Sequence, residues 1–147
     1  MRVVVTGGAG FIGRAVVRRL REVGHDVRGI VRQPGRAAHL EVNGARLVRG
    51  DLSSVPELVD QLADAEGLVH AAGAYRIGIA ESERAGMWDA NVGVTERVLQ
   101  AASRAGIQRI VYVSTNNVYG DTHGLIVDES YRRSIGDGFL SVYDESK

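Results

Sequence analysis

The chain has 147 residues, 44% of them hydrophobic and 24% charged, and its 18 Lys and Arg residues balance 18 Asp and Glu residues. This balance argues against nucleic acid or an anionic membrane as a partner, and the absence of cysteine excludes disulfides and thiolate metal sites. No apolar run reaches the roughly 20 residues of a membrane span, and the N-terminus lacks a signal-peptide pattern. We therefore expect one cytoplasmic domain without a metal site.

Strand and helix patterns alternate along the chain, and 115–142 reads as mainly loop. Tyr143 is expected to open a further helix. The elements expected before the loop are, in chain order, a strand at 2–6, a helix at 11–23, a strand at 26–31, a short helix at 36–42, a strand at 45–49, a helix through 55–62 capped by Ser53 or Ser54, a strand at 66–71, a long helix at 83–105 and a strand at 109–113. This alternation predicts an α/β fold, a Rossmann-like doubly wound parallel sheet with strand order 3-2-1-4-5.

Glycines are concentrated between the first strand and the first helix. Gly7 would permit a tight turn, Gly10 would let the backbone approach a pyrophosphate, and Gly13 would let helix and strand pack closely. Phe11 and Ile12 begin the helix, whose free N–H groups attract phosphate. A glycine-rich turn without a ligand is the alternative, but the flanking strand and amphipathic helix favour dinucleotide binding.

The end of the second strand indicates which dinucleotide is bound. An NAD site usually has an acidic residue there, hydrogen-bonded to the ribose. This chain has Ile30-Val31-Arg32-Gln33, without a carboxylate. Arg32 is able to pair with the 2′-phosphate of NADP, with help from Arg36, although a solvated loop arginine is the alternative. We expect NADP, with NAD as second choice.

Six stretches resemble, in order, the extended short-chain dehydrogenases/reductases, the family of NAD-dependent epimerases and dehydratases. The stretches are Thr6 to Gly13, Gly50-Asp51-Leu52, His70-Ala71-Ala72, Asn91 to Thr95, Val113 to Gly120 and Tyr143 to Lys147. The resemblance covers the whole chain and implies a cofactor-binding domain at 1–147. The family's C-terminal substrate domain is expected to be missing, so we expect the isolated chain to be inactive. In a complete member, the helix at 83–105 would form a homodimer interface.

The resemblance also implies roles around the cofactor. Asp51 and Leu52 would flank the adenine, with Asp51 accepting a hydrogen bond from its amino group. Ala71, Ala72 and Gly73 would line the cofactor where the fourth strand ends.

For two further residues of these stretches, His70 and Asn91, we expect structural roles. His70 is expected to end its strand as a packed residue rather than to act as a base. Asn91 is expected to brace the active site from the long helix, or else to be satisfied by backbone.

Tyr143 and Lys147 are four residues apart, so on a helix both face one ligand. A nearby ammonium favours the phenolate, which lets Tyr143 exchange a proton with a substrate oxygen while hydride moves. By resemblance, Lys147 also holds the nicotinamide ribose, and Thr115 orients the substrate, with Ser114 in reserve. Asn116-Asn117 replaces the Asp-Glu pair of some sugar dehydratases, which argues for redox chemistry or epimerisation.

The sequence therefore predicts the cofactor-binding part of an NAD(P)-dependent oxidoreductase or nucleotide-sugar epimerase. The substrate would be a small carbonyl or alcohol compound or a nucleotide sugar. The loop with Tyr131, Arg132 and Arg133 is either a substrate contact or solvated. One alternative is a non-catalytic redox sensor or regulatory module. Another is a protein that binds S-adenosylmethionine, but the glycine spacing and Arg32 disfavour a ligand without phosphates.

Overall fold

The computed structural model describes residues 1–76, 78–134, 136 and 138–147, and the chain divides into two compact units. The first, called the sheet unit, comprises 1–73 and 94–113. The second, called the tyrosine unit because it carries Tyr143, comprises 74–93 and 114–147.

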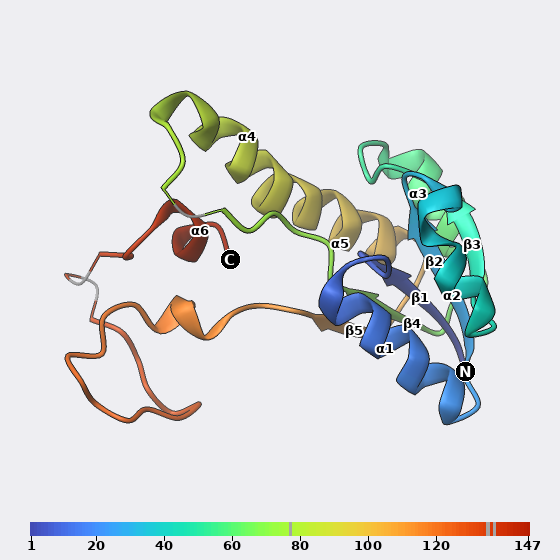
Figure 1. The fold of residues 1–147 in the computed structure, drawn as a ribbon, viewed down its shortest axis with the longest axis horizontal. Coiled ribbons are helices and arrows are strands. Elements are labelled where there is room, and N and C mark those ends of the chain that lie inside the picture. The colour runs from blue at the N-terminus through green and yellow to red at the C-terminus, as the bar shows by residue number, and fades with distance from the viewer. Residues whose placement is uncertain (77, 135, 137) are drawn as a thin grey trace. The chain divides into compact units, whose positions relative to one another are not determined.

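The sheet unit contains a five-stranded parallel sheet in the order β3-β2-β1-β4-β5 (Figure 1). The strands are β1 (Arg2–Thr6), β2 (Asp26–Val31), β3 (Arg46–Arg49), β4 (Gly67–His70) and β5 (Arg109–Tyr112). The predicted fold class and strand order are confirmed. Because the order reverses beside β1, the carboxyl ends of β1 and β4 form the place where doubly wound sheets bind their ligands.

Four α-helices belong to this unit: α1 (Phe11–Glu22), α2 (Ala38–Val42), α3 (Val55–Leu62) and α5 (Val94–Arg104). The 3-10 turn η1 (Pro34–Ala37) leads into α2. Of the two serines expected to cap α3, it is Ser54 whose hydroxyl accepts a hydrogen bond from the Glu57 N–H. Gly24, with a φ of 84°, follows the end of α1 in the left-handed conformation common for glycine after a helix.

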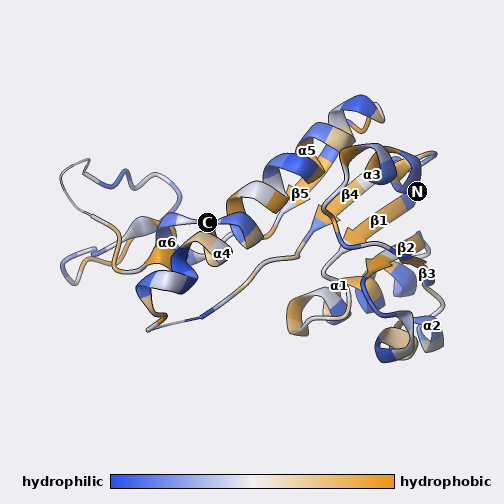
Figure 2. Cartoon of the chain, turned by 90° about the horizontal axis from the view of Figure 1, so that it is seen from above, coloured by the Kyte–Doolittle hydropathy of each residue, from blue (hydrophilic) through white to orange (hydrophobic). Residues whose placement is uncertain are grey.

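Apolar side chains fill both faces of the sheet, because successive residues of a strand point to opposite sides. On β1, Val4 faces α3 and α5, while Val3 and Val5 face α1 and α2. Figure 2 shows these helix pairs on opposite sides of hydrophobic strands. The central strands β1, β2 and β4 are thus largely buried on both faces, as near-continuous apolar runs allow, whereas β5 is more open, with Ile110 and Val111 38% and 58% exposed.

The tyrosine unit has little regular structure. Its helical segments are η2 (Glu81–Glu83), α4 (Arg84–Trp88), the π-helical turn η3 (Asp89–Gly93), the 3-10 turn η4 (Asn116–Tyr119) and α6 (Val142–Glu145). The helix expected at 83–105 is therefore helical along its length but contains a π-helical turn, which the apolar spacing did not predict. The Ser141 hydroxyl accepts the Asp144 N–H and caps α6.

In the part of the chain that the structure describes, none of the helices combines the length and apolar character needed to cross a bilayer.

Candidate cofactor and proton-transfer sites

The turn from β1 into α1 requires glycine at two of the three predicted positions, Gly7 and Gly13. Gly7 has a φ of 69°, and a Cβ added to it would lie 2.5 Å from the backbone of Ala71 and Ala72. A Cβ on Gly13 would collide with the Gly7 carbonyl oxygen. The Gly10 N–H donates to that same oxygen at 2.9 Å and closes the turn. The loop is thus packed so tightly that a side chain at Gly7 or Gly13 would collide with backbone.

The start of α1 is open to an anion. Its N-cap residue, Gly10, has no side chain with which to cap the first turn. Phe11 and Ile12, the first two residues of the helix, are 85% and 53% exposed. Uncapped N–H groups at the positive end of a 12-residue helix suit a phosphate, so the loop fits the pyrophosphate of a dinucleotide.

Arg32 and Asp51 are exposed residues that follow β2 and β3. The Ser53 hydroxyl and N–H both donate to Asp51 Oδ1, at 2.6 and 2.9 Å. These two bonds hold the pKa of the Asp51 carboxyl below its usual range, and the charge of Arg32 adds a smaller decrease. Asp51 is therefore an ionised acceptor at neutral pH.

Leu52 adopts a left-handed conformation with a φ of 66° and is half-buried. Its carbonyl oxygen accepts a hydrogen bond from Arg97 Nε at 3.3 Å, and its side chain packs against the core beneath α3 and α5. Such a conformation is rare for a branched residue and holds Leu52 next to Asp51 in a fixed turn.

The residues after β4 are small and lie beside the glycine loop. The Ala71 N–H donates to the Thr6 carbonyl at 3.1 Å, and Ala71 and Ala72 are half-buried, whereas Gly73 is exposed. Their backbone comes so close to Gly7 that no larger residue would fit there.

His70 is fully buried at the end of β4. Its Nδ1 lies 2.6 Å from the Thr6 hydroxyl, and its Nε2 lies 3.0 Å from the Thr95 hydroxyl. Its ring stacks on Tyr112, with centroids 5.6 Å apart. Because both ring nitrogens are hydrogen-bonded and covered, this geometry favours the packing role over a role as a base.

The predicted proton-transfer residues Thr115, Tyr143 and Lys147 all lie in the tyrosine unit. The Thr115 hydroxyl accepts the Asn117 N–H at 3.3 Å and caps η4. The reserve residue, Ser114, donates from its hydroxyl to the Lys147 carbonyl at 3.4 Å. The structure thus connects the approach to η4 with Lys147, which lies two residues beyond the end of α6 at Glu145. The joint action of the three side chains on a substrate stays a prediction.

Asn91 is 1% exposed and lies in the π-helical turn. Its Oδ1 accepts the Ala74 N–H at 2.7 Å, and its Nδ2 donates to the Ala74 carbonyl at 3.0 Å and to the Ser146 hydroxyl at 2.8 Å. The Ser146 hydroxyl in turn donates to the Tyr143 carbonyl at 2.9 Å. Asn91 therefore joins the Ala74 backbone to the segment that carries Tyr143. Two of its three bonds are to backbone, as the second sequence interpretation expected, and its bracing of an active site stays a prediction.

Three residues around α6 make contacts that sequence reasoning missed. The Asn117 amide donates to the carboxyl of Asp144, which is 2% exposed. The Tyr75 ring contacts the Tyr143 ring edge-to-face, with centroids 4.7 Å apart at 82°. The sequence carried no signal for either contact, because each joins segments far apart in the chain.

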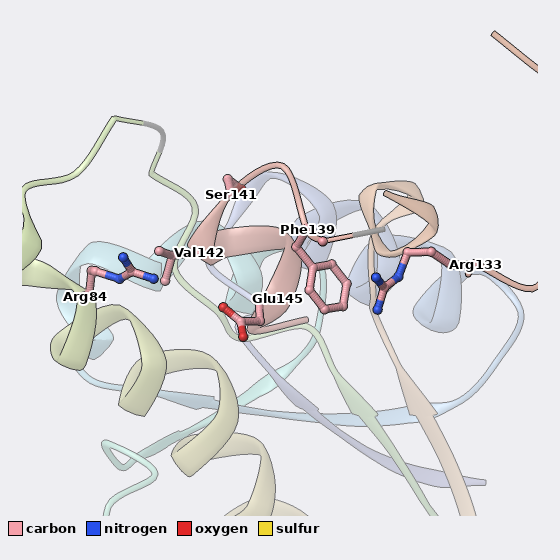
Figure 3. A pocket seen from close by; sticks show the side chains of 7 residues that line it. Arg84, Arg133, Phe139, Ser141, Val142 and Glu145 are labelled. Carbon is pink, nitrogen blue, oxygen red and sulfur yellow. The ribbon is translucent and has the colours of Figure 1, made fainter. Parts of the chain in front are cut away.

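A pocket of about 470 Å³ lies beside α4 and α6 within the tyrosine unit. Figure 3 shows Glu145 and Phe139 between Arg84 and Arg133, whose guanidinium lies 4.0 Å from the Phe139 ring centroid. The remaining lining residues are Gly138, Ser141 and Val142. This lining does not include the residues proposed for proton transfer.

Three loop residues were considered for substrate contact, and one of them, Arg133, lines this pocket. Tyr131 packs edge-to-face on Tyr119, and Arg132 donates to the carbonyls of Glu129 and Tyr131. These contacts lie within the loop, so its role toward a substrate stays a prediction.

Comparison with known proteins gives a consistent result. The model of the NAD dependent epimerase/dehydratase family matches residues 3–147. The chain is 39% identical over 132 residues to 4-hydroxy-2-methyl-3-oxo-4-farnesyl-3,4-dihydroquinoline-1-oxide ketoreductase of Stigmatella aurantiaca, which is 89% of this chain and 39% of that protein. It is 34% identical over 152 residues to a 3 beta-hydroxysteroid dehydrogenase/Delta 5-->4-isomerase of Mycobacterium tuberculosis. This match covers 99% of this chain and 40% of that protein.

A solved structure shows a similar level of sequence identity. The short-chain dehydrogenase/reductase superfamily protein of Agrobacterium tumefaciens with bound NAD is 32% identical, with a TM-score of 0.80 over all of this chain and 42% of that one. The chain spans about 40% of the length of the curated relatives it matches.

Proposed function

The chain belongs to the NAD-dependent epimerase/dehydratase family, and we propose that it forms the cofactor-binding part of an enzyme that reduces a carbonyl or oxidises an alcohol. The observation that carries this proposal is the glycine cradle, in which close backbone packing excludes side chains at Gly7 and Gly13, beside the uncapped start of α1. The names of two relatives, a ketoreductase and a hydroxysteroid dehydrogenase, favour redox chemistry over epimerisation. Epimerisation of a nucleotide sugar is the second candidate, supported by the family name.

We propose that the sheet unit holds the dinucleotide. Gly10 and the N–H groups of Phe11 and Ile12 would bind the pyrophosphate, since they present backbone donors without a competing side chain. The ionised Asp51 carboxylate and Leu52 would flank the adenine, with Asp51 accepting from its amino group. Ala71, Ala72 and Gly73 would line the middle of the cofactor, where their small size leaves room for it.

The choice of NADP is the finer part of the proposal. Arg32 stands directly after β2, exposed, where no carboxylate is present to repel a phosphate. A guanidinium matches the geometry of a phosphate, so Arg32 would pair with the 2′-phosphate, and Arg36 would add a second positive charge.

We further propose that the tyrosine unit carries the proton transfer. When bound, the nicotinamide supplies or accepts the hydride. The Tyr143 phenol would donate a proton to the substrate oxygen in reduction and take one in oxidation, with Thr115 orienting that oxygen. Lys147 would favour the phenolate through its charge and hold the nicotinamide ribose.

Calorimetric titration of the 147-residue chain with NADPH and NADH tests the cofactor proposal. We expect NADPH to bind more tightly than NADH, and Arg32→Glu to reverse this order, because the new carboxylate repels the 2′-phosphate. Arg104→Glu, at the far end of α5, is the matched charge control and should leave the order unchanged. Tighter binding of NADH by the unaltered chain would contradict the NADP assignment, and binding of neither would contradict the cofactor site.

A further inference from the structure

Tyr75 stands out among the side chains to which no function has yet been given. It lies in the segment that follows β4, and 63% of it is exposed to solvent. Its ring nevertheless contacts the half-buried ring of Tyr143 at 4.7 Å between centroids, in the edge-to-face geometry that aromatic pairs prefer. A large exposed ring is therefore held against the phenol that the proposed reaction uses.

The backbone on both sides of this contact is fixed by one buried side chain. Asn91 bonds both polar backbone groups of Ala74, the residue immediately before Tyr75. The same amide donates to Ser146, whose hydroxyl donates to the Tyr143 carbonyl. The two rings thus project from segments that a single network of hydrogen bonds holds together, so their contact follows from the fold of the unit.

We propose that Tyr75 is a positioning residue for the reaction: its ring holds the ring of Tyr143 in the orientation needed for proton transfer. This inference rests on the proposed function of Tyr143. A phenol delivers a proton only when its oxygen lies within hydrogen-bonding distance of the substrate oxygen. A tyrosine ring turns about two side-chain bonds, and the Tyr75 ring removes part of that freedom at the ring itself.

The contact uses the ring of Tyr75 and not its hydroxyl. Tyr75→Phe therefore preserves the positioning, whereas Tyr75→Leu removes it and keeps an apolar side chain. Trp88→Leu is the matched control, because it removes another partly exposed aromatic side chain from the same unit, on α4.

The first experiment measures the ring contact in the 147-residue chain. Proton–carbon NMR of ring-labelled tyrosine gives signals from five residues, and the signal missing in Tyr143→Phe identifies Tyr143. We expect Tyr75→Leu to shift the Tyr143 ring signal, and Tyr75→Phe and Trp88→Leu to leave it close to its original position. An unmoved signal in Tyr75→Leu overturns the proposal. This measurement needs neither cofactor nor substrate, so it stands even if the proposed function fails.

The second experiment measures NADPH-dependent reduction of cyclic and open-chain ketones by the complete natural protein. Tyr75→Leu should lower kcat roughly three- to tenfold with little change in KM or in NADPH affinity, because a misplaced phenol affects proton transfer more than binding. Tyr75→Phe should restore kcat. An unchanged kcat in Tyr75→Leu overturns the positioning role. A loss of kcat in Tyr75→Phe as large as that in Tyr75→Leu overturns it as well. No turnover and no NADPH binding by the unaltered protein would instead contradict the proposed function.

Discussion

The side-chain amide of Asn117 donates a 2.9 Å hydrogen bond to the carboxyl group of Asp144, the residue that follows Tyr143 in the chain. Asp144 is only 2% exposed, so its carboxyl group depends on protein donors in place of water. Its backbone N–H is also bonded, to the Ser141 hydroxyl that caps α6. The segment with Thr115 and the helix with Tyr143 are thereby joined through the side chain of Asn117.

Replacing Asn117 with alanine should destabilise the fold. The buried Asp144 carboxyl would lose its donor, and a buried polar group left unsatisfied costs about 1–3 kcal/mol. Urea denaturation followed by circular dichroism measures the free energy of unfolding. Asn116→Ala, which changes the exposed neighbouring amide, should cost much less. Equal losses in the two variants would show that the Asn117 bond is not needed.

Much of the sheet unit could be predicted because its signals are local. The β-branched runs of β1 and β2 and the glycines beside them reflect burial and turn geometry, which depend on neighbouring residues. The π-helical turn at Asp89–Gly93 was not predicted, because the apolar residues of 83–105 were interpreted as the stripe of one continuous helix. It accompanies the buried Asn91, whose partners Ala74 and Ser146 are distant in the sequence.

The candidate site divides in the same way. Gly7 and Gly13 could be assigned from their spacing, because the requirement for glycine is a backbone property. Asn117 was interpreted only as the absence of an acid, and Tyr75 was not considered at all. Both act through contacts between segments that only the folded chain brings together, so no spacing rule reveals them.

Two substitutions in the phosphate loop should separate folding from binding. Gly13→Ala should lower the free energy of unfolding by about 1–3 kcal/mol or more, because its Cβ meets the Gly7 carbonyl. Gly10→Ala places a Cβ 3.2 Å from that oxygen, a tight contact that a small shift relieves. It should keep the fold but raise the NADPH Kd at least about tenfold, about 1.4 kcal/mol, by crowding the pyrophosphate.

Gly86→Ala in α4 is the control, since an added Cβ there meets nothing within 4 Å. Thermal melting gives the stability of each variant, and calorimetric titration with NADPH gives its affinity for the cofactor. Unchanged NADPH affinity in Gly10→Ala would count against the predicted approach of the cofactor to this residue.

Glu66 should contribute an acid-sensitive part of the stability. Its Oε2 accepts the Arg2 N–H at 2.8 Å, and this bond is the main reason that the pKa of Glu66 lies below its usual value of 4.5. The charge of Arg2 adds a smaller decrease. A carboxyl with a lowered pKa in the folded state stabilises the protein above the unfolded-state pKa, and this stabilisation is lost as the pH falls through the folded-state pKa.

Urea midpoints measured between about pH 7 and pH 3 should therefore fall less steeply for Glu66→Gln than for the unaltered chain. The variant should also be less stable at neutral pH, where the charged acceptor is present in the original chain. Parallel pH profiles for the two proteins would show that the Arg2 bond does not stabilise the fold.

The buried histidine of β4 should act as a structural residue. His70→Phe retains a ring that can stack on Tyr112 but leaves the Thr6 and Thr95 hydroxyls without their bonds to the imidazole. We expect the free energy of unfolding to fall by about 1–3 kcal/mol or more, since two buried or half-buried hydroxyls lose a partner.

A triple variant distinguishes lost hydrogen bonds from lost packing at the same position. Thr6→Val and Thr95→Val remove the two hydroxyls, so adding them to His70→Phe makes the whole group apolar while keeping its volume. Replacing both partners of a buried hydrogen bond with apolar groups of similar shape is nearly neutral, so the triple variant should regain part of the stability lost in His70→Phe. Urea denaturation of the two variants measures this recovery. A triple variant less stable than His70→Phe alone would show that shape, and not hydrogen bonding, determines the requirement for histidine at the end of β4.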